Sequence, residues 1–142
     1  MIRELLIECR VLPTVDSIRS VRREIEATLS PMISADRVRD VVLVVSELCT
    51  NAVEAAEEGA CDVVVRVGVP SSRSVNIEVE DSGGGFALGD QGDASETDES
   101  GRGLSIVSWV ADDLEVERSR ERTVVRALLR SNETLKLASD LQ

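Results

Sequence analysis

Apolar and polar residues alternate strictly in several segments of the chain, which is the pattern of a strand that buries one face. The segments with this alternation are 2–11, 63–69, 75–79, 114–116 and 125–129. The turn-forming residues Pro70, Ser71 and Ser72 separate the second segment from the third, so these two predict a β-hairpin. The last two segments predict a pair of closing strands.

Between the first two of these strands, apolar residues recur every three or four positions, the pattern of an amphipathic helix. A first helix is expected to follow Thr14 and to end before Pro31. A second, longer helix should begin behind the capping residue Ser34 and stop at Gly59. A third, short helix is expected around residues 104–110. One-sided strands with these helices predict an α+β fold, a two-layer α/β sandwich with helices on one face of a mixed, mostly antiparallel sheet.

The length of 142 residues and an apolar share of 42% suit one domain with one core. We expect that domain over residues 1–130 and a flexible tail over 131–142. Seven of the nine glycines lie between Asp81 and Gly103, in a stretch that is also acidic and has almost nothing to bury. This stretch predicts a mobile loop.

The formal net charge of −11 excludes some classes of partner, because such a surface repels phosphate backbones and anionic lipid headgroups. Neither nucleic acid nor a membrane surface is expected as a partner. The longest aliphatic run, residues 41–45, is far shorter than the roughly 20 residues of a spanning helix, so no transmembrane segment or signal peptide is expected. With three cysteines, no CxxC spacing and no histidine, we expect a cytoplasmic protein without a disulfide framework or a thiolate metal site.

Strand parity brings a carboxylate toward the core. In the third strand Asp81 continues the inward face of Ile77 and Val79, and a buried carboxylate needs a hydrogen-bond donor. A ligand amino group would be such a donor, and the alternative is a local turn in which Asp81 bonds the loop backbone. The same parity places Thr123 inward at the start of the last strand.

Two further features are candidates for a binding site. Glu47 and Asn51 are four residues apart on the long helix and share a face beside the apolar stripe, so they can point at one site. The alternative is a solvated face. Gly101 and Gly103 precede the third helix, whose free N–H groups suit an anion such as phosphate, although an ordinary loop exit has the same composition.

Taken in order, these features resemble the anti-sigma factor serine kinases of bacteria. These kinases belong to the Bergerat-fold ATP-binding superfamily, which also contains histidine kinase catalytic domains and gyrase. The segment SELCTNAVEAA resembles the N box, DSGGG the first glycine box of the form DxGxG, and SGRGLSIV the second. The resemblance covers about residues 5–130, and four elements in the right order make a chance match improbable.

The resemblance implies ATP and Mg²⁺ as cofactors and assigns a role to each motif residue. Asn51 would hold Mg²⁺, Asp81 would accept a hydrogen bond from the adenine amino group, and Thr123 would assist there. Glu47 would take or position the proton of the attacking serine hydroxyl. The residues implied to approach the nucleotide or close over its phosphates are Gly83, Gly85, Gly101, Arg102, Gly103 and Leu104.

The implied function is an ATP-dependent protein serine kinase that sequesters a sigma factor and phosphorylates a serine of its anti-anti-sigma antagonist. The alternative is an ATP-binding anti-sigma module without phosphotransfer. Two residues depart from the family pattern: Ala55 stands where a histidine often follows the Asn by four positions, and Arg122 replaces the small residue that commonly precedes the Thr.

The first helix carries a candidate surface for partners. Arg19, Arg22 and Arg23 lie within five residues on an acidic chain, and arginine is favoured at interfaces. The resemblance implies a homodimer formed near the N-terminus, with this helix contacting the sigma factor and its antagonist. The alternative is a solvated face in which the arginines pair with Glu24 and Glu26.

Overall fold

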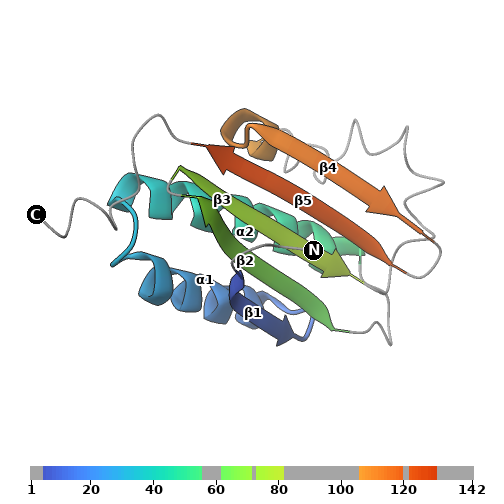
Figure 1. Cartoon of the computed structure of the whole chain (residues 1–142). Coiled ribbons are helices and arrows are strands. Elements are labelled where there is room, and N and C mark those ends of the chain that lie inside the picture. Colours follow the sequence, from blue (N-terminus) through green and yellow to red (C-terminus); the bar gives the residue numbers. More distant parts are fainter. Residues whose placement is uncertain (1–4, 56–61, 72, 82–105, 120–121, 131–142) are drawn as a thin grey trace, which may run out of the picture.

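The computed structural model describes residues 5–55, 62–71, 73–81, 106–119 and 122–130. The elements in chain order are β1 (Leu5–Val11), α1 (Val15–Leu29), α2 (Ala35–Ala55), β2 (Val63–Ser71), β3 (Ser74–Asp81), β4 (Asp113–Arg118) and β5 (Thr123–Arg130). A short helical stretch also covers residues 106–110. The strands form one sheet in the order β1-β2-β3-β5-β4, and α1 and α2 lie side by side behind it (Figure 1). The predicted α+β sandwich is confirmed.

Neighbouring strands are antiparallel in all four described pairings, so no parallel pair occurs in the described part of the sheet. The strands β2 and β3 form the predicted hairpin, and β5 rather than β4 pairs with β3. The two edges of the sheet are therefore β1 and β4. A register shift between Leu5 and Ile7 interrupts the regular pairing of β1 with β2.

Side-chain caps fix the starts of both long helices. The Oγ1 of Thr14 accepts the backbone N–H of Ser17 at 3.2 Å, and the Oγ of Ser34 accepts that of Arg37 at 3.2 Å. Both starts agree with the prediction, while the predicted stop at Gly59 lies outside the described residues. No helix in the described ranges is both long and apolar enough to cross a bilayer.

The core lies between the helices and the sheet and consists mainly of Val, Ile and Leu. From β3, Val75, Ile77 and Val79 are at most 2% exposed, and from α2 Val41 and Val45 are fully buried. Successive side chains of a strand point to opposite faces, so the residues at the ends of these inward rows continue toward the helix layer. This geometry positions the candidate site.

The open face of the sheet, opposite the helices, has a different composition. It carries charged side chains from neighbouring strands that pair across the sheet: Glu8, Arg66, Glu78, Glu80 and Arg126. An antiparallel sheet with one polar face is stable with only its apolar face covered, which explains why α1 and α2 lie on one side.

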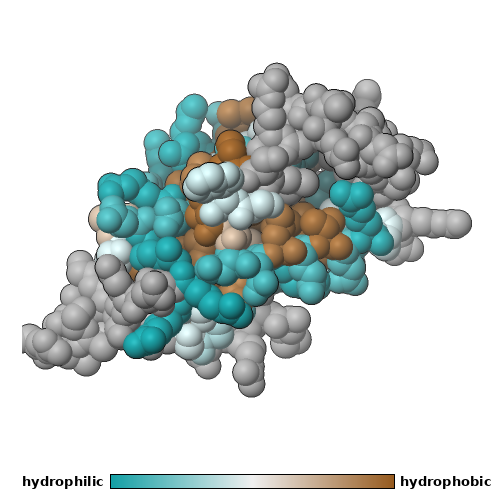
Figure 2. Space-filling model, turned by 90° about the horizontal axis from the view of Figure 1, so that it is seen from above, coloured by the Kyte–Doolittle hydropathy of each residue, from teal (hydrophilic) through white to brown (hydrophobic). Residues whose placement is uncertain are grey.

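Some apolar side chains remain exposed near β4. Trp109 is 90% exposed, Ile106 41% and Val116 37%. Figure 2 shows the molecule from above, which is the side on which β4 lies in Figure 1. Apolar surface gathers in the middle of this face, and hydrophilic residues border it. The buried Val107 connects the 106–110 stretch to the common core. Among the described elements, α1 packs against β1, and α2 packs against β2, β3 and β5.

Candidate functional site

Two polar side chains, Asp81 and Thr123, stand at the ends of the inward rows of β3 and β5. The register pairs Asp81 directly with Thr123, and with Val63 on its other side. Both are buried, with Asp81 5% and Thr123 7% exposed. Directly paired residues have Cβ atoms about 4.5–5.5 Å apart, so the carboxylate and the hydroxyl lie next to each other on the helix-covered face. The inward direction predicted from strand parity is confirmed.

The hydroxyl of Thr123 has no partner among the described residues. Its Oγ1 is buried and forms no hydrogen bond within the described chain. Leaving a buried polar group unsatisfied costs about 1–3 kcal/mol, so most such groups in native proteins have a partner. Asp81, by contrast, has an interaction of its own within the chain, and the local turn considered as its alternative remains open. The hydroxyl therefore marks the place where a ligand atom would be stabilising.

Glu47 and Asn51 lie one turn apart on α2, and both are half-buried. The end of this helix lies over the start of β2, because Cys49, Val53 and Val63 line one small pocket there. Asn51 is two residues from Val53, which is about 200° around the helix axis. Asn51 therefore lies on the flank of α2 that faces away from β1 and toward β3 and β5, the strands that carry Asp81 and Thr123.

Asn51 is the second residue with an unsatisfied buried atom in this region. Its Nδ2 has no hydrogen-bond partner among the described residues. Its side-chain oxygen is a type of ligand that Mg²⁺ accepts. No group of three His, Cys, Asp or Glu side chains in the described ranges could hold a metal. A Mg²⁺ ion at this place would be held through the side-chain oxygen of Asn51 and would take its other ligands from water and from phosphate groups, as is usual for this ion.

The glycines of both glycine boxes lie outside the described residues, as do all six residues expected to approach the nucleotide or its phosphates: Gly83, Gly85, Gly101, Arg102, Gly103 and Leu104. The structure does place both ends of this segment. It leaves the sheet at Asp81 and rejoins the described chain at Ile106. The assignments to these six residues stay predictions.

The sheet register adds a residue that the sequence analysis did not single out. Arg118 of β4 pairs directly with Thr123, so the row Asp81, Thr123, Arg118 crosses three neighbouring strands. Arg118 has the same parity as Leu114 and Val116, so the alternation of β4 places it on the helix-covered face. The sequence contained that signal, but the pairing with Thr123 requires the register.

The three arginines expected to meet protein partners, Arg19, Arg22 and Arg23, are exposed on α1. Arg19 forms a long ion pair of 3.9 Å with an exposed carboxylate one turn earlier. No ion pair joins Arg22 or Arg23 to Glu24 or Glu26, all of which lie in the described chain. The local pairing considered as the alternative is therefore not formed.

Thiolate chemistry does not contribute to this region. Burial, with a smaller contribution from the neighbouring Cys9, raises the pKa of Cys49 to about 12. Burial also raises the pKa of Cys9, assisted by Glu24. Both thiols are therefore protonated at neutral pH, and a protonated thiol is neither a nucleophile nor a metal ligand.

The family model described as the histidine kinase-like ATPase domain matches residues 11–129, which include the whole row of Asp81, Thr123 and Arg118. The chain belongs to this family. A comparison of the sequence with curated proteins found no match. The chain's family membership agrees with the motifs from which the resemblance was inferred.

Three solved structures share the fold of this histidine kinase-like ATPase domain. The chain with the RsbU and RsbW domains of Rv1364c from Mycobacterium tuberculosis matches with a TM-score of 0.64 and 21% identity, over 87% of this chain and 32% of that one. A chain of the SiaB-SiaC complex from Pseudomonas aeruginosa matches with a TM-score of 0.66 and 13% identity, over 89% of this chain and 90% of that one. The histidine kinase domain of the blue-light activated histidine kinase from Erythrobacter litoralis EL346 matches with a TM-score of 0.54 and 19% identity, over 87% of this chain and 62% of that one.

At these identities the likeness establishes the fold alone. The present chain spans about a third of the length of the Mycobacterium tuberculosis chain, which contains an RsbU and an RsbW domain. It spans nearly the whole length of the matched chain of the SiaB-SiaC complex.

Proposed function

We propose that this chain is an ATP-dependent protein serine kinase and anti-sigma factor, which sequesters a sigma factor and phosphorylates a serine of its anti-anti-sigma antagonist. The observation that carries the proposal is the buried pair of Asp81 and Thr123, whose hydroxyl has no partner in the described chain. Membership of an ATPase domain family supports nucleotide binding there. A neighbour solved in complex with a second protein, SiaB with SiaC, supports a protein partner.

In this proposal the base of ATP lies over the ends of β3 and β5. The carboxylate of Asp81 accepts a hydrogen bond from the exocyclic amino group of adenine. The hydroxyl of Thr123 both donates and accepts, so it can pair with a ring nitrogen or with water held at the base. A purine with a carbonyl oxygen in place of the amino group would bring an acceptor toward the carboxylate, so the site favours adenine.

The phosphates would lie along the flank of α2 that carries Asn51. Because the chain has a net charge of −11, binding of an uncompensated triphosphate is unfavourable. Bound Mg²⁺ would neutralise phosphate charge during transfer. Asn51 would hold this ion through its side-chain oxygen, and Glu47, one turn earlier, would orient the acceptor hydroxyl or take its proton.

Partner binding would use the N-terminal elements. We propose a homodimer formed near β1 and α1, with exposed Arg19, Arg22 and Arg23 contacting the sigma factor or its antagonist. Arginine forms bidentate pairs with carboxylates, which suits it to a protein interface.

A second function is favoured by one residue. Ala55 stands where the resemblance expects a histidine four residues after Asn51, so the chain lacks a side chain that these kinases often carry. An ATP-binding anti-sigma module without phosphotransfer is therefore the alternative.

Transfer of labelled phosphate from ATP to purified candidate antagonists separates the two functions, with Glu47→Ala as the matched control. Label on a serine of the antagonist that disappears in Glu47→Ala supports the kinase. ATP binding and sigma-factor capture without transfer supports the alternative. Absence of ATP binding by the folded protein would contradict both.

A further inference from the structure

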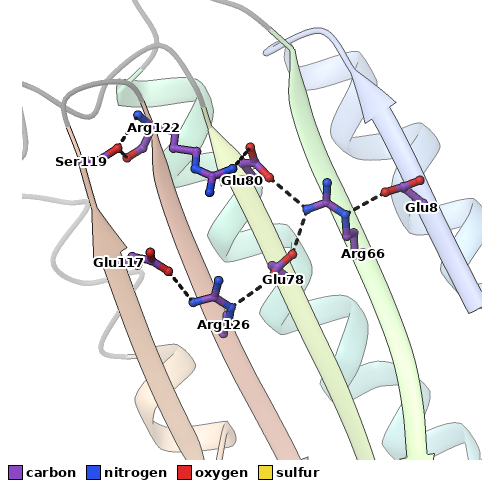
Figure 3. Close-up of polar contacts among 8 residues, drawn as sticks. All are labelled: Glu8, Arg66, Glu78, Glu80, Glu117, Ser119, Arg122 and Arg126. Carbon is purple, nitrogen blue, oxygen red and sulfur yellow. Dashed lines mark hydrogen bonds and ion pairs between the residues drawn. The ribbon is translucent and has the colours of Figure 1, made fainter. Parts of the chain in front are cut away.

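Arg122 departs from the family pattern, and the structure gives it a partner on the open face of the sheet (Figure 3). Its Nη1 donates to the Oε2 of Glu80 at 3.0 Å. The other carboxylate oxygen of Glu80 accepts the Nη1 of Arg66 at 3.0 Å. One carboxylate on β3 therefore joins a residue of β2 to the residue that precedes β5.

This ion pair lies directly behind the candidate site. Glu80 precedes Asp81 and Arg122 precedes Thr123, and successive residues of a strand point to opposite faces. The inward pair of Asp81 and Thr123 and the outward pair of Glu80 and Arg122 therefore use the same two strand ends. The register, which pairs Asp81 with Thr123, makes Glu80 and Arg122 diagonal neighbours within reach of long side chains.

The backbone of Arg122 is also held from the side of β4. Its carbonyl accepts the backbone N–H of Ser119 at 2.8 Å, and its own N–H donates to the Oγ of Ser119 at 3.2 Å. The hydrogen bonds between Ser119 and Arg122 thus fix the start of β5 to the end of β4, and the ion pair with Glu80 fixes it to β3 (Figure 3).

Glu80 is ionised and mostly buried in this position. Burial by itself raises its pKa, but hydrogen bonds from Arg66 and Arg122 outweigh that effect and hold the pKa below its ordinary value. Its side chain is 18% exposed, against 53% for Arg122. Arg66 is in turn bonded to Glu8 and Glu78 at 2.8 Å each, so Glu80 is anchored in a network that reaches β1.

We propose that Arg122 and Glu80 are a positioning pair for nucleotide binding. They hold the first residue of β5 against the last residue of β3, so that Thr123 and Asp81 meet the purine base at a fixed spacing. This inference rests on the proposed binding of ATP at that site. Strand ends are the least restrained part of a sheet, and a site built there gains affinity when its geometry is set before the ligand arrives.

The test measures ligand affinity by calorimetry for wild type, Arg122→Gln and Glu80→Gln, with ATP–Mg²⁺ and with adenosine. We expect both variants to weaken both ligands by a similar factor, about three- to tenfold, as for loss of one charge-assisted hydrogen bond in a partly exposed setting. The double variant should bind no more weakly than Glu80→Gln alone, because Glu80→Gln already removes the charge with which Arg122 pairs. Arg122→Lys, which keeps the cation, should remain within about twofold of wild type.

The two single variants separate positioning from simple charge. Arg122→Gln removes a positive charge and Glu80→Gln removes a negative one, so a purely electrostatic effect would weaken ATP in the first and strengthen it in the second. Adenosine is neutral and would respond to neither. Loss of ATP affinity in both variants, matched by loss of adenosine affinity, is the result that supports positioning. Weaker binding of ATP without weaker binding of adenosine would overturn it. Opposite changes of ATP affinity in the two variants would overturn it as well.

Arg130→Gln is the matched control. Arg130 lies at the other end of β5 and forms an exposed ion pair with Asp113 of β4 at 3.4 Å. This variant should shift the denaturant midpoint as little as Arg122→Gln does, and it should leave the affinity for both ligands unchanged. Equal loss of affinity in Arg130→Gln would mean that general weakening of β5 is responsible, which would refute the specific role of Arg122.

Asp81→Asn, measured in parallel, distinguishes failure of this inference from failure of the proposed function. If Asp81→Asn loses ATP while Arg122→Gln and Glu80→Gln bind normally, the site is correct and the positioning pair is wrong. If the wild-type protein does not bind ATP, or if Asp81→Asn binds it unchanged, the proposed nucleotide site is wrong and the inference is overturned with it.

Discussion

Thr123→Val replaces one hydroxyl group of the candidate site by a methyl group. The stability of the ligand-free protein should rise, and the affinity for ATP should fall. Thr123 is 7% exposed, and its Oγ1 is buried without a partner in the described chain. Valine has the same shape, suits a strand and replaces the hydroxyl by a methyl group. The variant therefore removes an unsatisfied polar group and creates no cavity.

The magnitude follows from the cost of such a group. An unsatisfied buried hydroxyl costs about 1–3 kcal/mol, so we expect the free energy of unfolding of the ligand-free protein to rise by about 1 kcal/mol. For a domain of this size, that corresponds to an increase in Tm of about 3–5 °C. A neutral hydrogen bond to the ligand contributes about 0.5–1.5 kcal/mol, so the affinity for ATP should fall about two- to tenfold.

Urea denaturation without nucleotide and calorimetric titration with ATP–Mg²⁺ measure the two effects. Thr123→Ser is the matched control, since it keeps the hydroxyl and removes a methyl group; it should retain ATP affinity and lose some stability. A Thr123→Val variant that is less stable than wild type would mean that the hydroxyl has a partner in the folded chain. Unchanged ATP affinity would remove Thr123 from the site.

The remaining predictions concern the other candidate residues. Asp81→Asn should weaken ATP binding by about tenfold to a hundredfold while the circular dichroism spectrum stays unchanged, because one charge-assisted hydrogen bond is lost. Asn51→Ala should lose phosphotransfer more than stability, and turnover by the wild type should stop in EDTA; equal turnover in EDTA would contradict the role of Mg²⁺. Glu47→Ala should bind ATP normally in calorimetry and fail in transfer to the antagonist, since its expected role is on the acceptor hydroxyl. Reversing the charge of Arg19 and Arg22 together should weaken capture of the sigma factor or antagonist in pull-down assays without changing ATP affinity.

Strand alternation alone predicted which side of the sheet each candidate residue would occupy. The period of two residues fixes the face of every side chain once one buried position is known, so Asp81 and Thr123 could be placed inward from the sequence. Capping residues likewise fixed the starts of both helices at Thr14 and Ser34. These are local properties, and local properties are readable from the chain.

Strand order and register could not be read in the same way. Asp81 meets Thr123 because β5, not the preceding β4, pairs with β3, and that choice depends on contacts between residues more than 40 positions apart. For the same reason the sequence does not reveal that Arg122, which departs from the family pattern, pairs with Glu80. The partner depends on a diagonal contact between two strands, which no periodicity in either strand specifies.

At the same strand ends, the inner face of the sheet therefore carries the candidate ligand groups and the outer face carries the ion pairs that restrain them. On the inner face, the ends carry the buried carboxylate of Asp81 and the hydroxyl of Thr123, and this hydroxyl, which has no partner among the described residues, weakens the fold where a ligand would be bound. On the outer face, Glu80 accepts from two arginines on opposite sides and restrains those ends. A site that contains an unsatisfied buried hydroxyl gains from support by residues that do not touch the ligand, and in this chain the alternation of the strands places such residues one position before each site residue.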